Sequence, residues 1–408
     1  MEYRALGELC TVTSSKRIFA EQYVSEGVPF YRSREIIEKN GNQDLSLELF
    51  ISEEVYNSIK EKFGVPQTGD LLMTSVGTLG IPYVVKDERF YFKDGNLTWM
   101  RDFSEELNSQ YLYYWFSSGF GKQSLIQKAI GSSQPALTIE ILKKYKLLVP
   151  PRREQDSIVE ILSKYDELLE ANNKRIKILE QMAENLYKEW FVRFRFPGHE
   201  DVEFVAGEPK DWELKRLEKI IKIDRGLSYS SEEIDCDDGS DLINLKNIQA
   251  YGGFRVDGTK KYSGQFKESQ VVKRGDLVMG VTDMTQDRRT VGAVALIPMI
   301  HNTSVISADL IRISSKYNNV FLYCMFKYGG VSRYISQFAN GANVLHLRPQ
   351  VVNRVKVYFP TKNVIDMFAE IVQPIIDEID TLNEGNDNLI RQRDLLLPRL
   401  MSGKIQVK

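Results

Sequence analysis

Residues that bind metals or form disulfides are scarce in this chain. Its 408 residues include three cysteines and three histidines. They stand far apart along the sequence: Cys10, Cys236, Cys324, His199, His301 and His346. A zinc site needs such ligands at short, regular spacing, and a disulfide framework needs an even number of cysteines. We therefore predict neither a metal site nor a disulfide.

Sequence signatures of catalysis are also missing. The chain has no Asn-Pro-Pro-aromatic tetrapeptide of the kind found in base-amino methyltransferases, and no glycine-rich fingerprint for a nucleotide cofactor. Gly121-Lys122 and Gly403-Lys404 lack the upstream glycine and the following Ser or Thr of a phosphate-binding loop. We predict no catalytic residue and no bound cofactor. An enzyme with an unrecognised motif remains an alternative.

Long apolar runs are absent too. The longest, residues 291–300, is about half of what a membrane span needs. The first ten residues lack the basic start and apolar core of a signal peptide. With 42% hydrophobic residues, the chain can instead bury two cores of about 150 residues each. A cytoplasmic protein without a membrane association is predicted.

What the chain does have is an internal repeat at a spacing of about 210 positions. The best-preserved part is a run of apolar residues at alternating steps of four and three, which is typical of a coiled-coil helix. In the first copy the run comprises Ile158, Leu162, Tyr165, Leu169, Asn172, Ile176, Leu179, Ala183, Leu186 and Trp190. In the second it comprises Phe368, Val372, Ile375, Ile379, Leu382, Asn386, Leu389, Arg393, Leu396 and Leu400.

Two tandem copies joined by short linkers can be related by an approximate twofold axis, which makes the two helices antiparallel. Full overlap then places Asn172 opposite Asn386, and a buried polar pair of this kind fixes the register of a seam. An exposed asparagine at an irregular position is the alternative. Pro374 predicts a kink or a break. In the case of a break, the continuous helix would start at this proline and residues 368–372 would form a separate short turn.

Each helix follows a region of short apolar runs and turns that predicts a mixed α/β domain. In the first region the runs lie at 29–31, 71–73, 82–85, 90–92 and 97–100, before a helix at 107–116. In the second, a helix at 213–223 precedes strands near 242–245, 277–279, 292–297 and 310–313 and a helix near 320–328.

The predicted fold class is α+β: two mixed α/β domains in tandem repeat, held apart by two long antiparallel coiled-coil helices with pseudo-twofold symmetry. The domains are expected at 1–150 and 198–360, the second including a linker at 198–212, and the helices at 151–197 and 361–408. Residues 208–360 carry 22 Lys and Arg against 17 Asp and Glu, whereas the other three segments are net acidic. DNA binding by this chain alone should therefore be weak.

Two motifs resemble a known family. The first is Pro150-Pro151-Arg152-Arg153-Glu154-Gln155, followed by the helix and by the segment Leu186-Tyr187-Lys188-Glu189-Trp190-Phe191-Val192-Arg193-Phe194-Arg195-Phe196-Pro197-Gly198. The second is Leu395-Leu396-Leu397-Pro398-Arg399-Leu400-Met401-Ser402-Gly403-Lys404-Ile405. Together with the repeat, they resemble Type I restriction-modification specificity subunits over the whole chain. The second helix departs from the pattern, because Val364-Ile365 replaces Glu-Gln.

The resemblance implies a non-catalytic subunit whose two domains are target recognition domains for a two-part, asymmetric site in double-stranded DNA. It implies docking of two methyltransferase (modification) subunits on the helices. Restriction subunits would be further partners, and a subunit that works without them, in modification only, is the alternative. S-adenosylmethionine would be bound by the methyltransferase partner and not by this chain. The aromatic cluster around Trp190 and Phe191 would suit such docking, or simply pack the end of the coiled coil. A non-catalytic coiled-coil scaffold with peptide-binding domains is the alternative function.

Arg and Lys read guanine best, Asn and Gln read adenine, and Ser and Thr hold phosphates. We therefore expect DNA contacts from these residue types on loops. In the first domain the candidates are Lys16, Arg17, Arg32, Arg34, Ser75, Thr78, Ser132, Ser133 and Gln134. In the second they are Arg225, Tyr229, Lys246, Asn247, Gln286, Arg288, Arg289, Asn343, His346 and Arg348. Solvated surface charges, an ordinary turn at 131–134 and a core role for Tyr229 are the competing interpretations.

Overall fold

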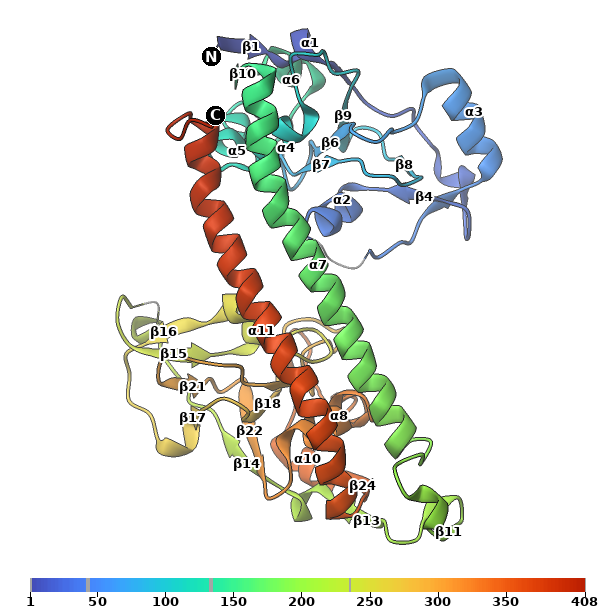
Figure 1. Ribbon diagram of the computed structural model, residues 1–408, viewed down its shortest axis with the longest axis vertical. Helices are drawn as coiled ribbons and strands as arrows, with labels where there is room; N and C mark the ends of the chain where they lie inside the picture. Colours follow the sequence, from blue (N-terminus) through green and yellow to red (C-terminus); the bar gives the residue numbers. More distant parts are fainter. Residues whose placement is uncertain (1, 42–44, 132–134, 235, 408) are drawn as a thin grey trace. The chain divides into compact units, whose positions relative to one another are not determined.

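The computed structural model describes residues 2–41, 45–131, 135–234 and 236–407. It forms two compact units, Met1–Asn172 with Gly385–Lys408, and Asn173–Glu384. Each unit contains one mixed α/β domain and a part of both long helices, α7 (Arg152–Phe191) and α11 (Lys362–Met401) (Figure 1). Among the described residues, no helix combines the length and apolar character needed to cross a membrane.

Two four-stranded sheets build the domain of the first unit. One has the order β2-β9-β6-β7 and is antiparallel, with strands Thr11–Thr13, Leu97–Arg101, Leu71–Thr74 and Pro82–Val84. The other has the order β3-β5-β4-β8, with strands Tyr23–Val24, Phe50–Ile51, Val28–Tyr31 and Tyr91–Phe92. In it, β4 and β8 are parallel. A separate pair, β1 (Glu2–Ala5) and β10 (Lys146–Val149), joins the two ends of the domain.

The helices of this domain in its described residues are α1 (Leu6–Leu9), α2 (Ser33–Asn40), α3 (Glu53–Phe63), α4 (Ser109–Ser117), α5 (Gly119–Ile126) and α6 (Ile139–Lys144). Polar side chains begin several of them. Ser52, Asn108 and Thr138 accept hydrogen bonds from backbone N–H groups of the first helical turn, which have no partner within the helix. The apolar faces of α4 and α6 then pack with Ile158 and Leu162 of α7 and with the C-terminal turns of α11 in one core.

The domain of the second unit repeats this plan. Its sheets have the orders β14-β22-β18-β20 and β16-β15-β21-β17, with β15 and β21 parallel. The first comprises Ile221–Arg225, Leu310–Ser315, Leu277–Gly280 and Val294–Leu296, and the second Lys260–Tyr262, Ser240–Ile243, Ser304–Ile306 and Val271–Val272. Smaller pairs are formed by β13 (Glu213–Arg216) with β24 (Lys356–Phe359), β19 (Thr282–Asp283) with β23 (Leu345–His346), and β11 (Phe204–Val205) with β12 (Glu208–Pro209). The helices are α8 (Asn319–Lys327), α9 (Val331–Ser336) and α10 (Pro349–Arg354).

Equivalent hydrogen bonds show how closely the two domains correspond. The backbone N of Leu6 donates to the carbonyl of Tyr145 at 2.8 Å, and that of Leu217 donates to the carbonyl of Val355 at 2.8 Å. Asn108 and Asn318 both cap the helix that follows them. The sequence repeat is therefore a repeat of topology and not only of the long helices.

The two long helices are antiparallel within each unit. In the first, Asn172 Nδ2 donates to Asn386 Oδ1 at 2.8 Å, which confirms the predicted polar pair. Arg393 of α11 donates to Asp166 of α7 at 2.9 Å. In the second unit, Arg175 pairs with Glu378 at 2.9 Å. None of the seam residues named above from Ile158 to Leu186 and from Phe368 to Leu400 is fully exposed.

Two expected elements are wrong. Residues 213–223 form β13, a short 3-10 turn and the start of β14, not a helix, because Glu213–Arg216 pairs with a strand that is far away in sequence. The predicted break at Pro374 is also wrong, since α11 is a single helix from Lys362 to Met401. Phe368 and Val372, expected in a separate turn, are part of this helix and fully buried.

The aromatic cluster at the end of α7 belongs to the core of the second unit. Trp190 is 5% exposed and its ring centroid lies 5.7 Å from that of Phe368. Phe191 contacts the rings of Trp212 and Phe321 as well. Packing at the end of the coiled coil is therefore the correct interpretation of this cluster.

Candidate nucleic-acid interface

Three of the predicted loop segments of the first domain meet at one edge of its antiparallel sheet. β2 and β6 end at this edge and β9 begins there. Ser14 Oγ donates to the carbonyl of Leu97 at 3.2 Å, Ser33 Oγ to that of Asn96 at 3.5 Å, and Ser75 N to that of Asn96 at 2.8 Å. We call this surface, from Ser14 to Arg17, Arg32 to Arg34 and Ser75 to Gly80, the first loop edge. The sheet thus gathers segments that are distant in sequence.

The cations of the first loop edge are partly neutralised. Arg32 donates to Glu35 at 2.7 Å and to Glu48 at 3.0 Å, and Arg34 donates to the same Glu48 at 2.8 Å. Hydrogen bonds from Arg32 and then Arg34 hold the pKa of Glu48 below its ordinary value. Ser33 and Arg34 lie in α2 and not on a loop, which corrects the expectation for this segment.

The remaining candidates of this domain differ in accessibility. Lys16 is exposed with its Nζ 4.8 Å from the ring centroid of Phe63, and Arg17 pairs with Asp94 at 2.8 Å. Thr78 is exposed, whereas Ser75 is buried and its hydroxyl bonds that of Thr98 at 2.6 Å. Ser75 therefore has a structural role, and its side chain is not available to contact a ligand. Ser132, Ser133 and Gln134 lie outside the described residues.

The second domain has an equivalent edge, where β14 and β18 end and β22 begins. Gly226 N donates to the carbonyl of Leu310 at 3.2 Å, and Val281 N to that of Asp309 at 2.8 Å. Two loops project from it. Residues 281–292 leave from β18, and residues 340–347 join them through the pairing of β19 with β23 and through Gln286 Nε2, which donates to the carbonyl of Ala342 at 3.0 Å. We call this surface the second loop edge.

Several predicted residues come together at the second loop edge. Arg225 ends β14, Arg348 follows the second loop, and Lys246 lies on the 3-10 turn Leu245–Asn247, which packs against β18. Residues 286–289, Asn343 and His346 lie on the two loops. All of these side chains are exposed: Arg225, Lys246, Gln286, Arg288, Arg289, Asn343, His346 and Arg348.

The cations of this edge differ from those of the first in their partners. Arg289 pairs with Asp287 at 2.6 Å. Arg225, Lys246, Arg288 and Arg348 form no ion pair within the described part of the chain. Positive charge that is not already neutralised is what contact with phosphates or base edges requires. The second loop edge therefore has more cations without an ionic partner than the first.

Two predicted residues of the second domain have structural roles instead. Asn247 is fully buried, and its amide donates to the carbonyl of Arg255 and to Thr259 Oγ1, both at 2.8 Å. Tyr229 is half-buried and packs against a small core that includes Leu242. Tyr229 thus packs in part against the core and keeps an exposed portion, whereas Asn247 does not present its side chain at the surface.

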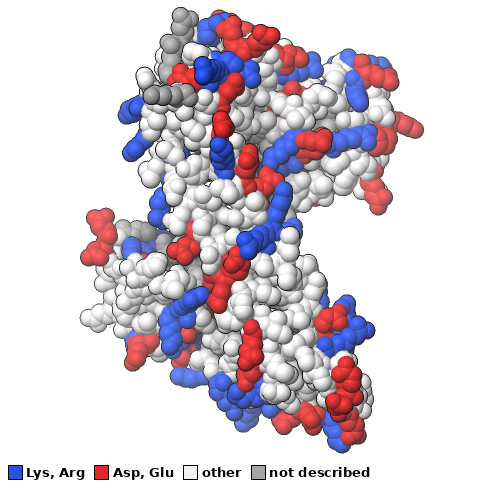
Figure 2. All heavy atoms as spheres, in the orientation of Figure 1, with Lys and Arg blue, Asp and Glu red and all other residues white. Residues whose placement is uncertain are grey.

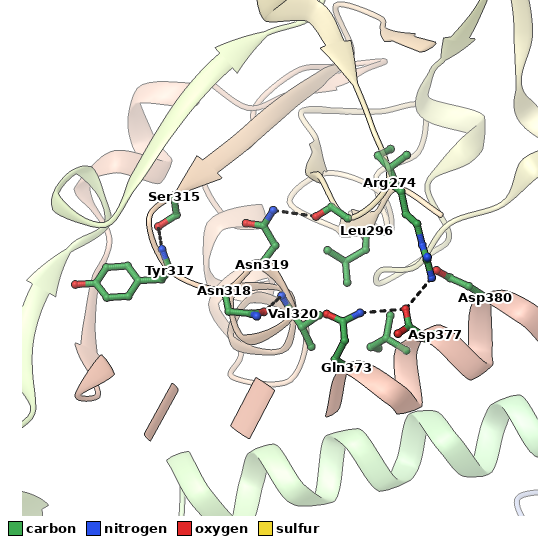
Figure 3. A pocket seen from close by; sticks show the side chains of 13 residues that line it. Arg274, Leu296, Ser315, Tyr317, Asn318, Asn319, Val320, Gln373, Asp377 and Asp380 are labelled. Carbon is green, nitrogen blue, oxygen red and sulfur yellow. Dashed lines mark hydrogen bonds and ion pairs between the residues drawn. The ribbon is translucent and has the colours of Figure 1, made fainter. Parts of the chain in front are cut away.

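The opposite edge of each sheet faces a long helix. In the second unit, a pocket of about 250 Å³ lies where β18 begins and β20 and β22 end, against α11. Figure 3 shows Arg274 reaching toward Asp377 and Asp380 across it, and the Arg274–Asp377 distance is 2.8 Å. In the first unit, Lys86 pairs with Glu170 of α7 at 2.8 Å. Each sheet therefore has a helix at one edge and its candidate loops at the other.

The side chains at the two loop edges differ from those of a metal site. The described part of the chain contains no cluster of three or more His, Cys, Asp or Glu side chains that could hold a metal ion. On the face drawn in Figure 2, acidic and basic side chains alternate without a broad patch of one sign. The two loop edges have the side chains of recognition surfaces: exposed cations, amides and hydroxyls on loops that a sheet holds in place.

Comparison with known proteins gives a consistent result. Residues 1–181 match the family described as Type I restriction modification DNA specificity domain. The chain is 24% identical to the Type I restriction enzyme MjaIX specificity subunit of Methanocaldococcus jannaschii, over 83% of this chain and 78% of that protein. It is 22% identical to the MjaVIII specificity subunit of the same organism, over 73% and 71%. The crystal structure of the specificity subunit from M. genitalium has the same fold, with a TM-score of 0.59, 17% identity and coverage of 98% and 95%.

Proposed function

Because residues 1–181 match the Type I specificity domain and most of the chain is similar to specificity subunits, we propose that it is such a subunit and recognises a two-part, asymmetric target in double-stranded DNA, one part through each loop edge. The observation that carries the proposal is the repetition of the loop edge. In both domains the same strand ends support the surface, but the side chains on it differ. Two different surfaces on one scaffold suit two different half-sites.

The chemistry of the exposed side chains supports DNA as the ligand. Arg225, Arg288, Lys16 and Arg17 can contact guanine or phosphates, and Asn343 and Gln286 can contact adenine. Because the net charge of the chain is −2, we expect its partners to supply part of the electrostatic attraction to DNA. Binding by the chain alone should weaken steeply with salt.

The proposal includes partners for catalysis. Two methyltransferase (modification) subunits would dock on the long helices, and restriction subunits would join the complex. Large apolar side chains are exposed on both helices, as interfaces require: Leu168, Ile178 and Met182 on α7, and Ile371 and Leu395 on α11. S-adenosylmethionine would be bound by the methyltransferase partner, so this chain would have no catalytic role of its own.

The experiment that tests the proposal is a map of methylated adenines across the host genome with and without this gene. We expect a gapped, asymmetric motif whose methylation disappears with the gene and returns when the gene is restored. An unchanged map, in cells shown to contain an active modification subunit, would contradict the proposal. It would instead favour a scaffold with peptide-binding domains.

A further inference from the structure

We infer that the loop from Asp283 to Val291 is a preformed base-reading element, in which Arg288 contacts a guanine of the second half-site and Asp283 positions the loop. This inference rests on the proposed function and deepens it. It assigns guanine to the second loop edge. It also distinguishes Arg288, which would contact DNA, from Asp283, which would act by positioning the loop that carries Arg288.

Asp283 fastens the two sides of this loop together. Its carboxylate is 2% exposed. Oδ1 accepts hydrogen bonds from Thr285 N at 2.8 Å and Thr285 Oγ1 at 2.9 Å, and Oδ2 accepts one from Thr290 N at 2.7 Å. A second, longer bond to Oδ2 comes from Val291 N at 3.4 Å. One buried side chain thus fixes both the start and the end of the loop.

Neighbouring segments hold the loop from outside. Leu345 and His346 pair with Asp283 and Thr282. Gln286 is tied to the carbonyl of Ala342, and Tyr251 N donates to the carbonyl of Arg289 at 2.7 Å. A loop whose backbone is fixed at so many points loses little backbone conformational entropy on binding, so the Cα of Arg288 is already in position when DNA arrives.

Among the described residues of the loop, Arg288 is the cation without a side-chain partner. Thr285 is bonded to Asp283, and Asp287 and Arg289 are paired with each other. Arg288 is exposed and has neither a hydrogen bond through its side chain nor an ion pair with any residue that the structure describes. Its backbone has φ +54°, in the left-handed region that few residues other than glycine adopt. The surrounding contacts hold the backbone in this unfavourable conformation, which is common at functional sites.

The chemistry of the guanidinium selects guanine. Arginine has five N–H donors in a planar fork and no acceptor, and the paired O6 and N7 acceptors of guanine match two of these donors in the major groove. Phosphates can be held by flexible lysines, whereas a fixed planar fork is suited to two acceptors in fixed geometry. The counterpart in the first domain, residues 75–80, is shorter and contains no Lys or Arg. The proposed arginine contact from this loop therefore has no counterpart in the first domain.

The test uses the complex of the full chain with its modification subunits and sequences the DNA that it methylates. Four variants are compared with the wild type: Arg288→Ala, Arg288→Lys, Asp283→Asn and, as a control, Arg333→Ala, an exposed arginine on α9 outside the loop edges. We expect Arg288→Ala to lose roughly tenfold or more of the discrimination at one guanine, with the first half-site unchanged. Arg288→Lys should retain part of that discrimination.

Asp283→Asn should relax the same guanine position to a smaller extent, because the loop is loosened but Arg288 is still present. Relaxed specificity at the same guanine in Asp283→Asn and Arg288→Ala is a result that a general loss of stability would not produce. Melting temperatures of all variants identify any that fail to fold. Equal loss of methylation at every site in Arg288→Ala would indicate a phosphate contact and overturn the inference, as would an unchanged motif. If the wild-type complex itself yields no two-part motif, the proposed function fails instead.

Discussion

A few polar residues buried among apolar ones set the geometry of each unit. The pair Asn172 and Asn386 is an example, since Asn386 is 8% exposed in a seam that is mostly apolar. Such a pair adds little stability, but removal of one partner leaves a buried amide without its hydrogen bond.

We predict that Asn386→Leu lowers the free energy of unfolding by about 1–2 kcal/mol, because Asn172 loses its acceptor. The double variant Asn172→Leu with Asn386→Leu should regain most of this loss, since both polar groups are gone. Thermal denaturation of the two single variants and the double variant measures the coupling. Additive effects in the double variant would show that the pair does not interact.

Asp380, on α11 beside the pocket in Figure 3, gives a prediction about pH. Burial raises the pKa of Asp380 to about 6, Asp377 adds to the increase, and Arg274 opposes it. In the unfolded chain the carboxyl ionises near pH 4. The folded state therefore binds this proton more tightly than the unfolded state does. The contribution of Asp380 to the free energy of unfolding falls as the pH rises from about 4 to about 6 and stays low above that.

Asp380→Asn should accordingly raise the melting temperature at pH 7.5, by an amount that corresponds to about 1–3 kcal/mol, and have little effect at pH 4. Glu370→Gln, at an exposed position of the same helix, is the matched control and should change neither value. A lower melting temperature for Asp380→Asn at pH 7.5 would mean that the charged form stabilises the fold.

At the scale of the element, α11 tolerates residues that oppose a helix. Pro374 stands in its interior, lacks a backbone donor and is exposed. Gly385 lies further along the same helix, and a methyl group added to it would have no atom within 4 Å. Both residues have low helix propensity and are expected to reduce the stability of the helix.

We predict that Pro374→Ala raises the free energy of unfolding by up to about 3 kcal/mol and Gly385→Ala by about 1 kcal/mol, in line with helix propensities. Chemical denaturation of both variants tests this. Gly385→Ala calibrates the method, because no rearrangement is needed there. A destabilised Pro374→Ala alongside a stabilised Gly385→Ala would indicate that the proline imposes a bend on which the packing depends.

Elements were predictable from the sequence where local pattern and tertiary pairing agree. The apolar runs at 71–73 and 277–279 are β6 and β18, and Asn108 and Asn318 mark the starts of α4 and α8. The run 213–223 was misread because Leu217, Ile220 and Ile221 have helical spacing, whereas the strand there depends on β24, which no local pattern reveals. The helix α2 was missed because an arginine, and not Ser or Asp, precedes it; Glu35, at its third position, was the available signal.

The candidate site was predictable in part for the same reason. Residue types on loops identified Arg225, Gln286 and Arg288, which the fold brings to one edge. They could not distinguish Asn247, whose amide is used inside the domain, from Asn343, which is exposed. The role of Asp283 was missed, since the partners of a carboxylate become visible only when the loop is folded.

At the scale of the whole molecule, duplication explains the architecture. One sequence unit contains a domain and a helix, and two copies give two loop edges on equivalent sheets. Insertions such as the longer loop at 281–292 alter one copy without altering its partner. If each loop edge reads one half-site, as proposed, recognition of the two half-sites would change independently.

The most direct test compares the methylated motif after substitutions at one loop edge at a time. In complexes with modification subunits, Lys16→Ala with Arg17→Ala changes the first edge, and Arg225→Ala with His346→Ala changes the second. We predict that each pair relaxes or weakens only one half of the gapped motif, and that the two pairs affect opposite halves. Changes confined to the same half, or an equal change in both halves for either pair, would contradict the assignment of one half-site to each domain.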